Sequence, residues 1–128
     1  MYPITTITTS LLALIYLFLS VKVIGLRKFH KISIGAKENQ LLERAMRAHG
    51  NFAEYVPLSI LLIACSEVNR ANTIFLAILA GMVVSGRLTH AYAFLYHKQH
   101  FTPRTIGMIL TFLAIIILAF LNLVLLFV

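Results

Sequence analysis

The chain has few charged residues and almost no cysteine. Only 12% of its 128 residues are charged, and 4 acidic residues stand against 11 Lys and Arg. The 1 cysteine, Cys65, excludes an intrachain disulfide and any metal site built from several cysteines. Cys65 ends an apolar run, so we expect its thiol to be buried and inert.

The chain is instead rich in apolar residues. Hydrophobic residues make up 60% of the chain, and its mean hydropathy is +0.92. A small water-soluble domain keeps a large fraction of its surface exposed and could not hide so much apolar area. The apolar stretches are long runs without alternation, so the sequence predicts one all-α integral membrane domain over residues 1–128 and no β-barrel.

Four apolar stretches are long enough to cross a membrane. They cover about Ile4–Ile24, Ala45–Ser66, Thr73–Tyr96 and Ile106–Val128, and each has the roughly 20 residues that a bilayer requires. Short connections predict antiparallel neighbours in an up-down four-helix bundle. No basic residue precedes the first apolar run, which favours a retained first helix over a cleaved signal peptide.

The basic residues flank the spans and form no separate polar module, so we do not expect nucleic acid as a partner. Nine of the 11 Lys and Arg lie in or beside the first and third connections: Lys22, Arg27, Lys28, Lys31, Lys37, Arg44, Arg47, Lys98 and Arg104. The positive-inside rule places these connections in the cytoplasm and both termini outside.

The second span carries polar residues that a lipid-facing helix would not have. Arg47, Asn51 and Glu54 are spaced i, i+4, i+7 and therefore share one stripe of the helix. Ionisable groups at hydrocarbon depth cost several kcal/mol, so they persist only when paired, hydrated or used. The stripe is expected to face other protein or a ligand.

Two interpretations of the polar residues stay open. In an antiparallel hairpin Glu54 and Arg87 lie at the same depth, about 10 Å from the cytoplasmic side, and His49 is level with His90. Glu54 and Arg87 could form a structural ion pair that fixes the register of two helices. Alternatively, the polar residues together line a site.

Glycines and histidines give weaker signals. Gly81 and Gly86 in the third span permit close helix contact. His97 and His100 are spaced i, i+3 with no carboxylate nearby, and nothing matches a spaced motif such as His-Glu-x-x-His. We therefore expect no metal site.

The polar second span resembles that of a known family. Its pattern Glu43-Arg44-x-x-Arg47-Ala48-His49-x-Asn51-x-x-Glu54-Tyr55-x-Pro57 is similar to the second-helix signature of the MAPEG proteins, membrane-associated proteins in eicosanoid and glutathione metabolism. The size, the four spans and the basic first connection agree, so the resemblance covers the whole chain. The short bacterial members are most similar, which implies a bacterial inner membrane.

The resemblance implies a homotrimer that binds glutathione between adjacent subunits near the cytoplasmic face. Arg104, which follows Pro103, matches the proposed catalytic arginine of the family. Gly50 stands where some members have arginine, and Phe94 where one branch has tyrosine. The resemblance and the polar stripe together give ten candidate glutathione-binding residues: Arg27, Arg47, His49, Asn51, Glu54, Tyr55, Arg87, His90, Tyr92 and Tyr96.

The chemistry of glutathione, the implied co-substrate, suits these side chains. Its two carboxylates match the guanidinium groups through bidentate hydrogen bonds. Glu54 suits its ammonium group, and Asn51 can serve its amides. A cationic Arg104 near the sulfur would favour thiolate over thiol. The thiolate would then attack a lipophilic electrophile or peroxide that arrives from the membrane lipid.

The sequence therefore predicts a microsomal-type glutathione transferase or peroxidase. One alternative is a non-enzymatic lipid- or ligand-binding protein of the same fold. Another is a small multidrug transporter, which usually has a membrane-embedded acid in its first helix, whereas Ile4–Ile24 contains none. Thiol consumption separates the enzyme from the binder, and counterflow in liposomes tests transport.

Overall fold

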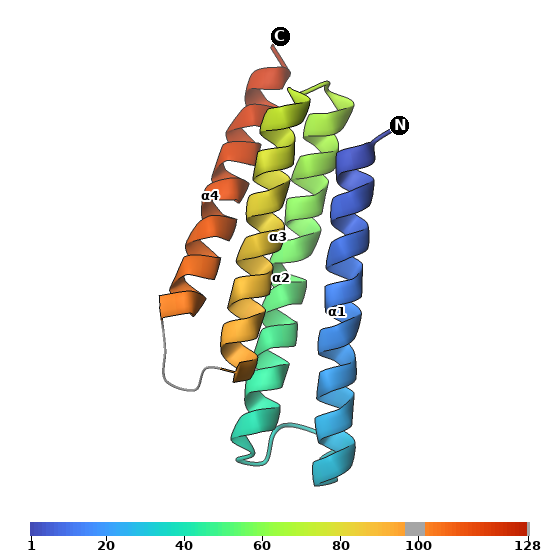
Figure 1. Cartoon of the computed structure of the whole chain (residues 1–128), viewed down its shortest axis with the longest axis vertical. Coiled ribbons are helices and arrows are strands. Elements are labelled where there is room, and N and C mark those ends of the chain that lie inside the picture. The colour runs from blue at the N-terminus through green and yellow to red at the C-terminus, as the bar shows by residue number, and fades with distance from the viewer. Residues whose placement is uncertain (97–101, 128) are drawn as a thin grey trace.

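The computed structural model describes residues 1–96 and 102–127, and this part of the chain is helical with no strand (Figure 1). Its four helices are each long and apolar enough to cross a membrane, which confirms the predicted all-α membrane fold. They are α1 (Pro3–His30), α2 (Gln40–Val68), α3 (Thr73–Tyr96) and α4 (Thr102–Leu125).

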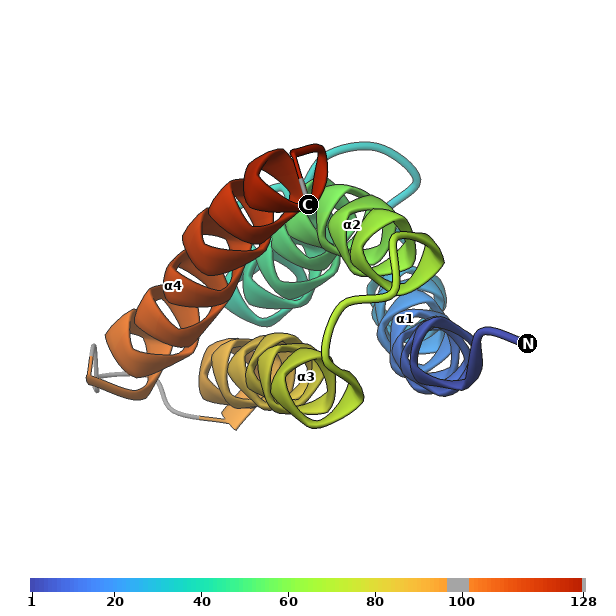
Figure 2. The ribbon, with the colours of Figure 1, turned by 90° about the horizontal axis from the view of Figure 1, so that it is seen from above.

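The helices run alternately up and down, as the short connections predict. Figure 1 shows the start of α1, the end of α4 and the α2–α3 turn at one end of the bundle, with the α1–α2 connection at the opposite end. Seen along the helices, α2 and α3 lie between α1 and α4, which do not contact each other in the described residues (Figure 2). The α2–α3 pair is therefore the centre of the bundle, and it carries the polar residues.

Three helices extend beyond the predicted spans, because hydropathy marks hydrocarbon depth whereas helical hydrogen bonds continue past it. α1 is followed by Lys31, whose backbone is left-handed and whose N–H donates to the carbonyls of Arg27 and Lys28. α2 begins after Asn39, whose Oδ1 accepts from the Leu42 N–H at 2.9 Å. α4 begins at Thr102, which places Arg104 inside its first turn.

The N-terminus of α1 is capped by a residue far away in sequence. The Glu67 carboxylate, in the last turn of α2, accepts from the N–H groups of Ile4 at 2.9 Å and Thr5 at 2.8 Å. These two donors are among the first of α1 and have no partner within the helix. A carboxylate is favourable there because it also opposes the positive end of the helix dipole. Glu67 therefore ties α1 to the end of α2.

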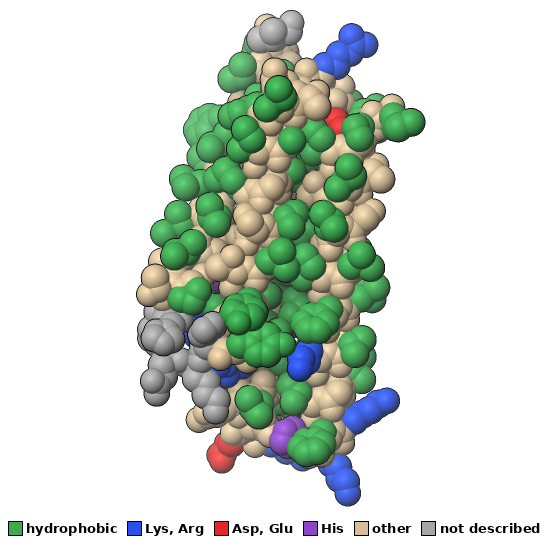
Figure 3. All heavy atoms as spheres, viewed as in Figure 1, with side chains coloured by type: hydrophobic (Ala, Val, Ile, Leu, Met, Phe, Trp, Pro, Cys, Tyr) green, Lys and Arg blue, Asp and Glu red, His purple; other side chains and the backbone are tan. Residues whose placement is uncertain are grey.

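Hydrophobic side chains are spread over the visible outer surface of the bundle. Figure 3 shows hydrophobic side chains along the bundle, with Lys and Arg gathered near the end that holds the α1–α2 connection. Cys65 belongs to this surface, since it is exposed, and its expected burial is wrong. Lipid-facing and protein-facing residues are equally apolar in a membrane helix, so hydropathy cannot assign the face of one residue.

The backbones of α3 and α4 approach closely at a pair of glycines. A Cβ added to Gly107 would lie 2.6 Å from the Gly86 carbonyl oxygen and 2.8 Å from the His90 nitrogen. Gly86 thus permits the close helix contact that the sequence predicts. Its partner in α4, Gly107, was not predicted. Gly81 does not share this contact, because nothing lies within 4 Å of its added Cβ.

Gly107→Ala is expected to destabilise the bundle by about 1–3 kcal/mol, the usual effect of overpacking. The clashing atoms belong to backbone, so the two helices must separate to admit the methyl group. Thermal unfolding of the purified protein in one detergent measures the loss. Gly81→Ala is the matched control and should unfold like the wild type. Equal unfolding midpoints for Gly107→Ala and the wild type would contradict this packing.

Candidate functional site

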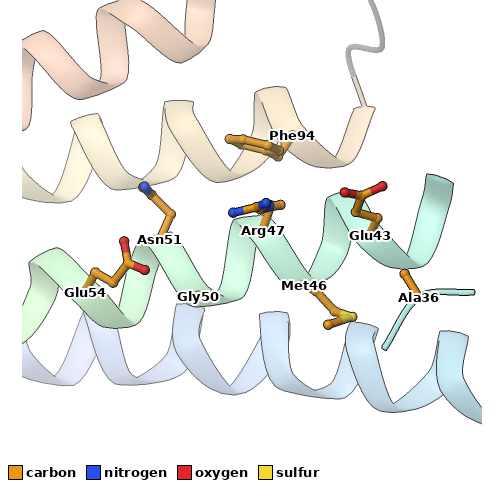
Figure 4. Close-up of a pocket in the computed structure, with 8 residues that line it drawn as sticks. All are labelled: Ala36, Glu43, Met46, Arg47, Gly50, Asn51, Glu54 and Phe94. Atoms are coloured by element: carbon orange, nitrogen blue, oxygen red, sulfur yellow. The ribbon is translucent and has the colours of Figure 1, made fainter. Parts of the chain in front are cut away.

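Polar side chains follow one another along one face of α2 and line an open cavity of about 500 Å³. In Figure 4 the side chains of Glu43, Arg47 and Asn51 rise from α2 toward α3, which contributes Phe94. We call this space the α2 cavity. Its described lining residues are Ala36, Glu43, Met46, Arg47, Gly50, Asn51, Glu54 and Phe94.

The two charged groups of the predicted stripe are exposed in the single chain. Neither Arg47 nor Glu54 bonds another described side chain, and Glu54 is the middle residue of α2, which spans Gln40–Val68. A carboxylate halfway along a membrane helix would be costly against lipid. The cavity face of α2 is therefore suited to contact with protein, water or a polar ligand.

Arg87 lies behind the cavity, buried between helices with 1% of its surface exposed. Its Nη1 donates to Asn51 Oδ1 at 2.7 Å, and its Nε donates to Thr111 Oγ1 at 2.9 Å. Its Nη2 approaches the Met108 sulfur at 3.1 Å and the Gly107 carbonyl at 3.5 Å. All of these partners are neutral, so the guanidinium charge has no counter-charge among the described residues that it contacts.

The Glu54–Arg87 ion pair that the sequence left open does not form. Arg87 reaches Asn51 instead, and its Cζ lies 5.1 Å from the centre of the Tyr55 ring. That ring also packs on Phe112, with centroids 5.5 Å apart. Tyr55, a predicted ligand, therefore supports Arg87 and is not among the described lining residues of the cavity.

Arg104 lies next to a cavity residue. Its Cζ is 4.3 Å from the centre of the Phe94 ring, an arrangement typical of a cation–π contact. His90 packs on the same ring at 5.1 Å between centroids, and its Nδ1 donates to the Arg104 carbonyl at 3.0 Å. Phe94, noted in the sequence only as a departure from tyrosine, thus connects Arg104 to the α2 cavity.

Arg44 anchors the end of α3 that carries Phe94, a contact that the sequence did not predict. Its Nε donates to the Phe94 carbonyl at 2.7 Å, and its Nη2 reaches the Ala93 carbonyl at 3.4 Å. The last carbonyls of a helix lack intrahelical donors and are natural partners for arginine. Arg44 immediately follows Glu43, so one turn of α2 both lines the cavity and holds its opposite wall.

Arg27 folds the first connection back toward the cavity. Its Nη1 donates to the carbonyls of Ser33 at 3.0 Å and Gly35 at 3.2 Å, and its Nη2 approaches the sulfur of Met46 at 3.4 Å. Both Met46 and Ala36, which follows Gly35, line the cavity. Arg27 therefore shapes this end of the cavity without being among its described lining residues.

His49 faces away from the α2 cavity and joins α2 to α1. Its Nε2 lies 3.0 Å from Ser20 Oγ, and its ring stacks on Tyr16 at 4.6 Å between centroids. Because Ser20 Oγ also donates to the Tyr16 carbonyl at 2.9 Å, it is free to accept from His49. His49 is thus not brought together with His90.

Two more candidates, Tyr92 and Tyr96, are exposed and pack on each other at 5.0 Å between centroids. Neither is among the described lining residues of the cavity. His97 and His100, weighed as metal ligands, lie outside the described residues. Within those residues no three His, Cys, Asp or Glu side chains gather as a metal site would need.

Sequence reasoning found part of the cavity and missed the rest. The period of 3.6 brings Arg47, Asn51 and Glu54 together, and the same period could have added Glu43 one turn earlier. Thr111, which bonds Arg87 and is not among the described lining residues of the cavity, was missed because it lies in the most apolar helix, where a single hydroxyl gives no pattern.

The fold and the cavity define a class: an integral membrane protein of four helices with a polar cavity on its second helix. The sequence model of the MAPEG family matches residues 5–124, and the chain belongs to that family. The chain is similar to the inner membrane protein YecN of Escherichia coli strain K12, with 34% identity over 111 residues, covering 87% of this chain and 83% of the relative. YecN of strain O6:H1 gives the same values.

Proposed function

We propose that the protein is a membrane-bound glutathione transferase or peroxidase acting on hydrophobic electrophiles or lipid hydroperoxides. The observation that carries this proposal is the pattern of charge in the α2 cavity. Donors of Arg47 and Asn51 and the carboxylate of Glu54 lie on successive turns of one helix, within a space of about 500 Å³. Glutathione offers carboxylates, carbonyls and an ammonium group to match them.

A homotrimer is part of the proposal, with glutathione held between adjacent subunits. The exposed position of Glu54 at the middle of α2 supports it, because a neighbouring subunit would shield that charge from lipid.

An apolar groove beside the cavity supports a lipophilic second substrate. It measures about 260 Å³, lies between α1 and α2, and is lined by Leu12, Tyr16, Phe52 and Pro57 among others. Phe52 directly follows Asn51, so the polar cavity and the apolar groove lie on adjacent sides of the same turn of α2.

We also propose that the cavity faces the cytoplasm and that both termini lie outside. The cavity is near the end that carries the first connection, since Ala36 lines it, and nine of the 11 Lys and Arg lie in or beside the first and third connections of the sequence. The relatives' printed name, inner membrane protein, suits a bacterial inner membrane. Fusing reporters to the C-terminus tests the orientation.

Purified protein in nanodiscs tests the function itself. Calorimetric titration should show saturable glutathione binding. Adding chlorodinitrobenzene or a lipid hydroperoxide should then consume thiol in proportion to protein, with empty nanodiscs as the control. Binding without consumption of thiol would support the second candidate, a non-enzymatic ligand-binding protein. One observation favours that candidate: Arg104 contacts Phe94 and is not among the described lining residues of the cavity.

A further inference from the structure

The bond between Arg87 and Asn51 fixes the orientation of an amide at the cavity surface. A guanidinium group has only N–H donors, so the atom of Asn51 that it meets at 2.7 Å must be the carbonyl oxygen. The two substituents of an amide point in different directions. The NH₂ group of Asn51 is therefore turned away from Arg87, and the nitrogen is the visible tip of this side chain in Figure 4.

The environment of Arg87 keeps this orientation in place. The guanidinium is 1% exposed, and its other described partners are a hydroxyl, a sulfur and a backbone carbonyl. The reversed amide would set two N–H donors against a buried cation and remove one of its few acceptors. Such a loss is costly for a buried charge.

We propose that Arg87 is a positioning residue that makes Asn51 a hydrogen-bond donor toward the α2 cavity. At this point the cavity then selects a ligand group that accepts a hydrogen bond, such as a carboxylate or a carbonyl, and disfavours an ammonium group, which can only donate. Arg47, one turn earlier on the same wall, offers only donors as well. Glu54, on the next turn, accepts. The inference rests on the proposed function where it names the ligand, since glutathione presents carboxylate, carbonyl and ammonium groups.

Asn51→Asp distinguishes the contact with Arg87 from the contact with the cavity. The side chain keeps its shape, but both of its terminal atoms become hydrogen-bond acceptors. Toward Arg87 it supplies an anion to a guanidinium that is already buried without one. Toward the cavity it replaces the donor by negative charge. We expect the unfolding midpoint without ligand to equal or exceed that of the wild type, while glutathione affinity in calorimetry falls at least about 10-fold, as for a lost hydrogen bond to a charged group.

Asn122→Asp is a matched control with the opposite amide orientation. Asn122 Nδ2 donates to the Leu62 carbonyl at 3.0 Å and to the Leu118 carbonyl at 2.9 Å. Aspartate there loses both bonds, so the unfolding midpoint should fall while glutathione affinity stays unchanged. The same chemical substitution should thus give opposite results at two interhelical asparagines.

Arg87→Met completes a double-mutant cycle with Asn51→Asp. With Arg87 removed, the aspartate becomes a buried anion without its partner, so the double variant should unfold earlier than either single variant. The proposal is overturned if Asn51→Asp lowers the unfolding midpoint as much as Asn51→Ala does, or if it leaves glutathione affinity unchanged. A wild type that binds no glutathione would instead overturn the proposed function. The melting experiments would then decide the orientation of Asn51 by themselves.

Discussion

Arg104→Ala is expected to lose most of the conjugation rate, about 100-fold or more, the usual cost of removing one group that stabilises charge at the reacting atom. A guanidinium near the sulfur of bound glutathione would lower the thiol pKa from the ordinary thiol value of about 8.5. The variant should therefore also lose the ultraviolet thiolate absorbance near neutral pH. Its glutathione affinity should remain, because Arg104 is not among the described lining residues of the α2 cavity.

Arg104 lies next to the α2 cavity without being among its described lining residues. Its guanidinium lies over the Phe94 ring, and Phe94 lines the cavity, so Phe94 is the contact between Arg104 and the proposed glutathione site. Arg70→Ala is the matched control, since Arg70 is exposed in the turn between α2 and α3, at the other end of the bundle. It should leave both rate and absorbance unchanged.

Two outcomes would count against activation by Arg104. In the first, Arg104→Ala keeps the wild-type rate with chlorodinitrobenzene. In the second, the wild type itself shows neither thiolate absorbance nor turnover although it binds glutathione. The second outcome would make the non-enzymatic ligand-binding protein the better description.

Arg47→Ala and Glu54→Ala are each expected to weaken glutathione binding by about 1–3 kcal/mol, the range for a charge-assisted hydrogen bond. That loss corresponds to roughly 5- to 150-fold in the dissociation constant. Both side chains line the cavity, and neither bonds another described residue. Their replacement should therefore leave the unfolding midpoint without glutathione close to that of the wild type.

Calorimetric titration, combined with melting in the presence and absence of glutathione, separates binding from stability. Arg70→Ala and Glu38→Ala are the controls, because both positions are exposed outside the helices and should change neither quantity. Folded variants with wild-type affinity would remove Arg47 and Glu54 from the ligand site. An equal loss of stability with and without ligand would instead indicate a purely structural polar network.

The three polar residues of the stripe could be predicted as neighbours because one helix fixes their spacing. Arg47, Asn51 and Glu54 line the same cavity, and the period of 3.6 requires nothing from other helices to bring them together. Arg87 is the contrasting example. Depth along an antiparallel pair placed it near Glu54, but depth leaves the rotation of α3 open, and the structure turns Arg87 inward to Asn51 and Thr111.

Hydropathy and helical period were enough to predict the class and the four spans, and the residue pattern of the second span carried the family resemblance, because all of these depend on residues close together in the chain. The match of residues 5–124 to the MAPEG family model agrees with that prediction. Which side of each helix meets protein became clear from the packing of the four helices. This packing buried Arg87, exposed Cys65, brought Gly107 against Gly86 and turned His49 toward α1. In a membrane both faces of a helix are apolar, so rotation is set by packing and interhelical hydrogen bonds, which hydropathy does not encode.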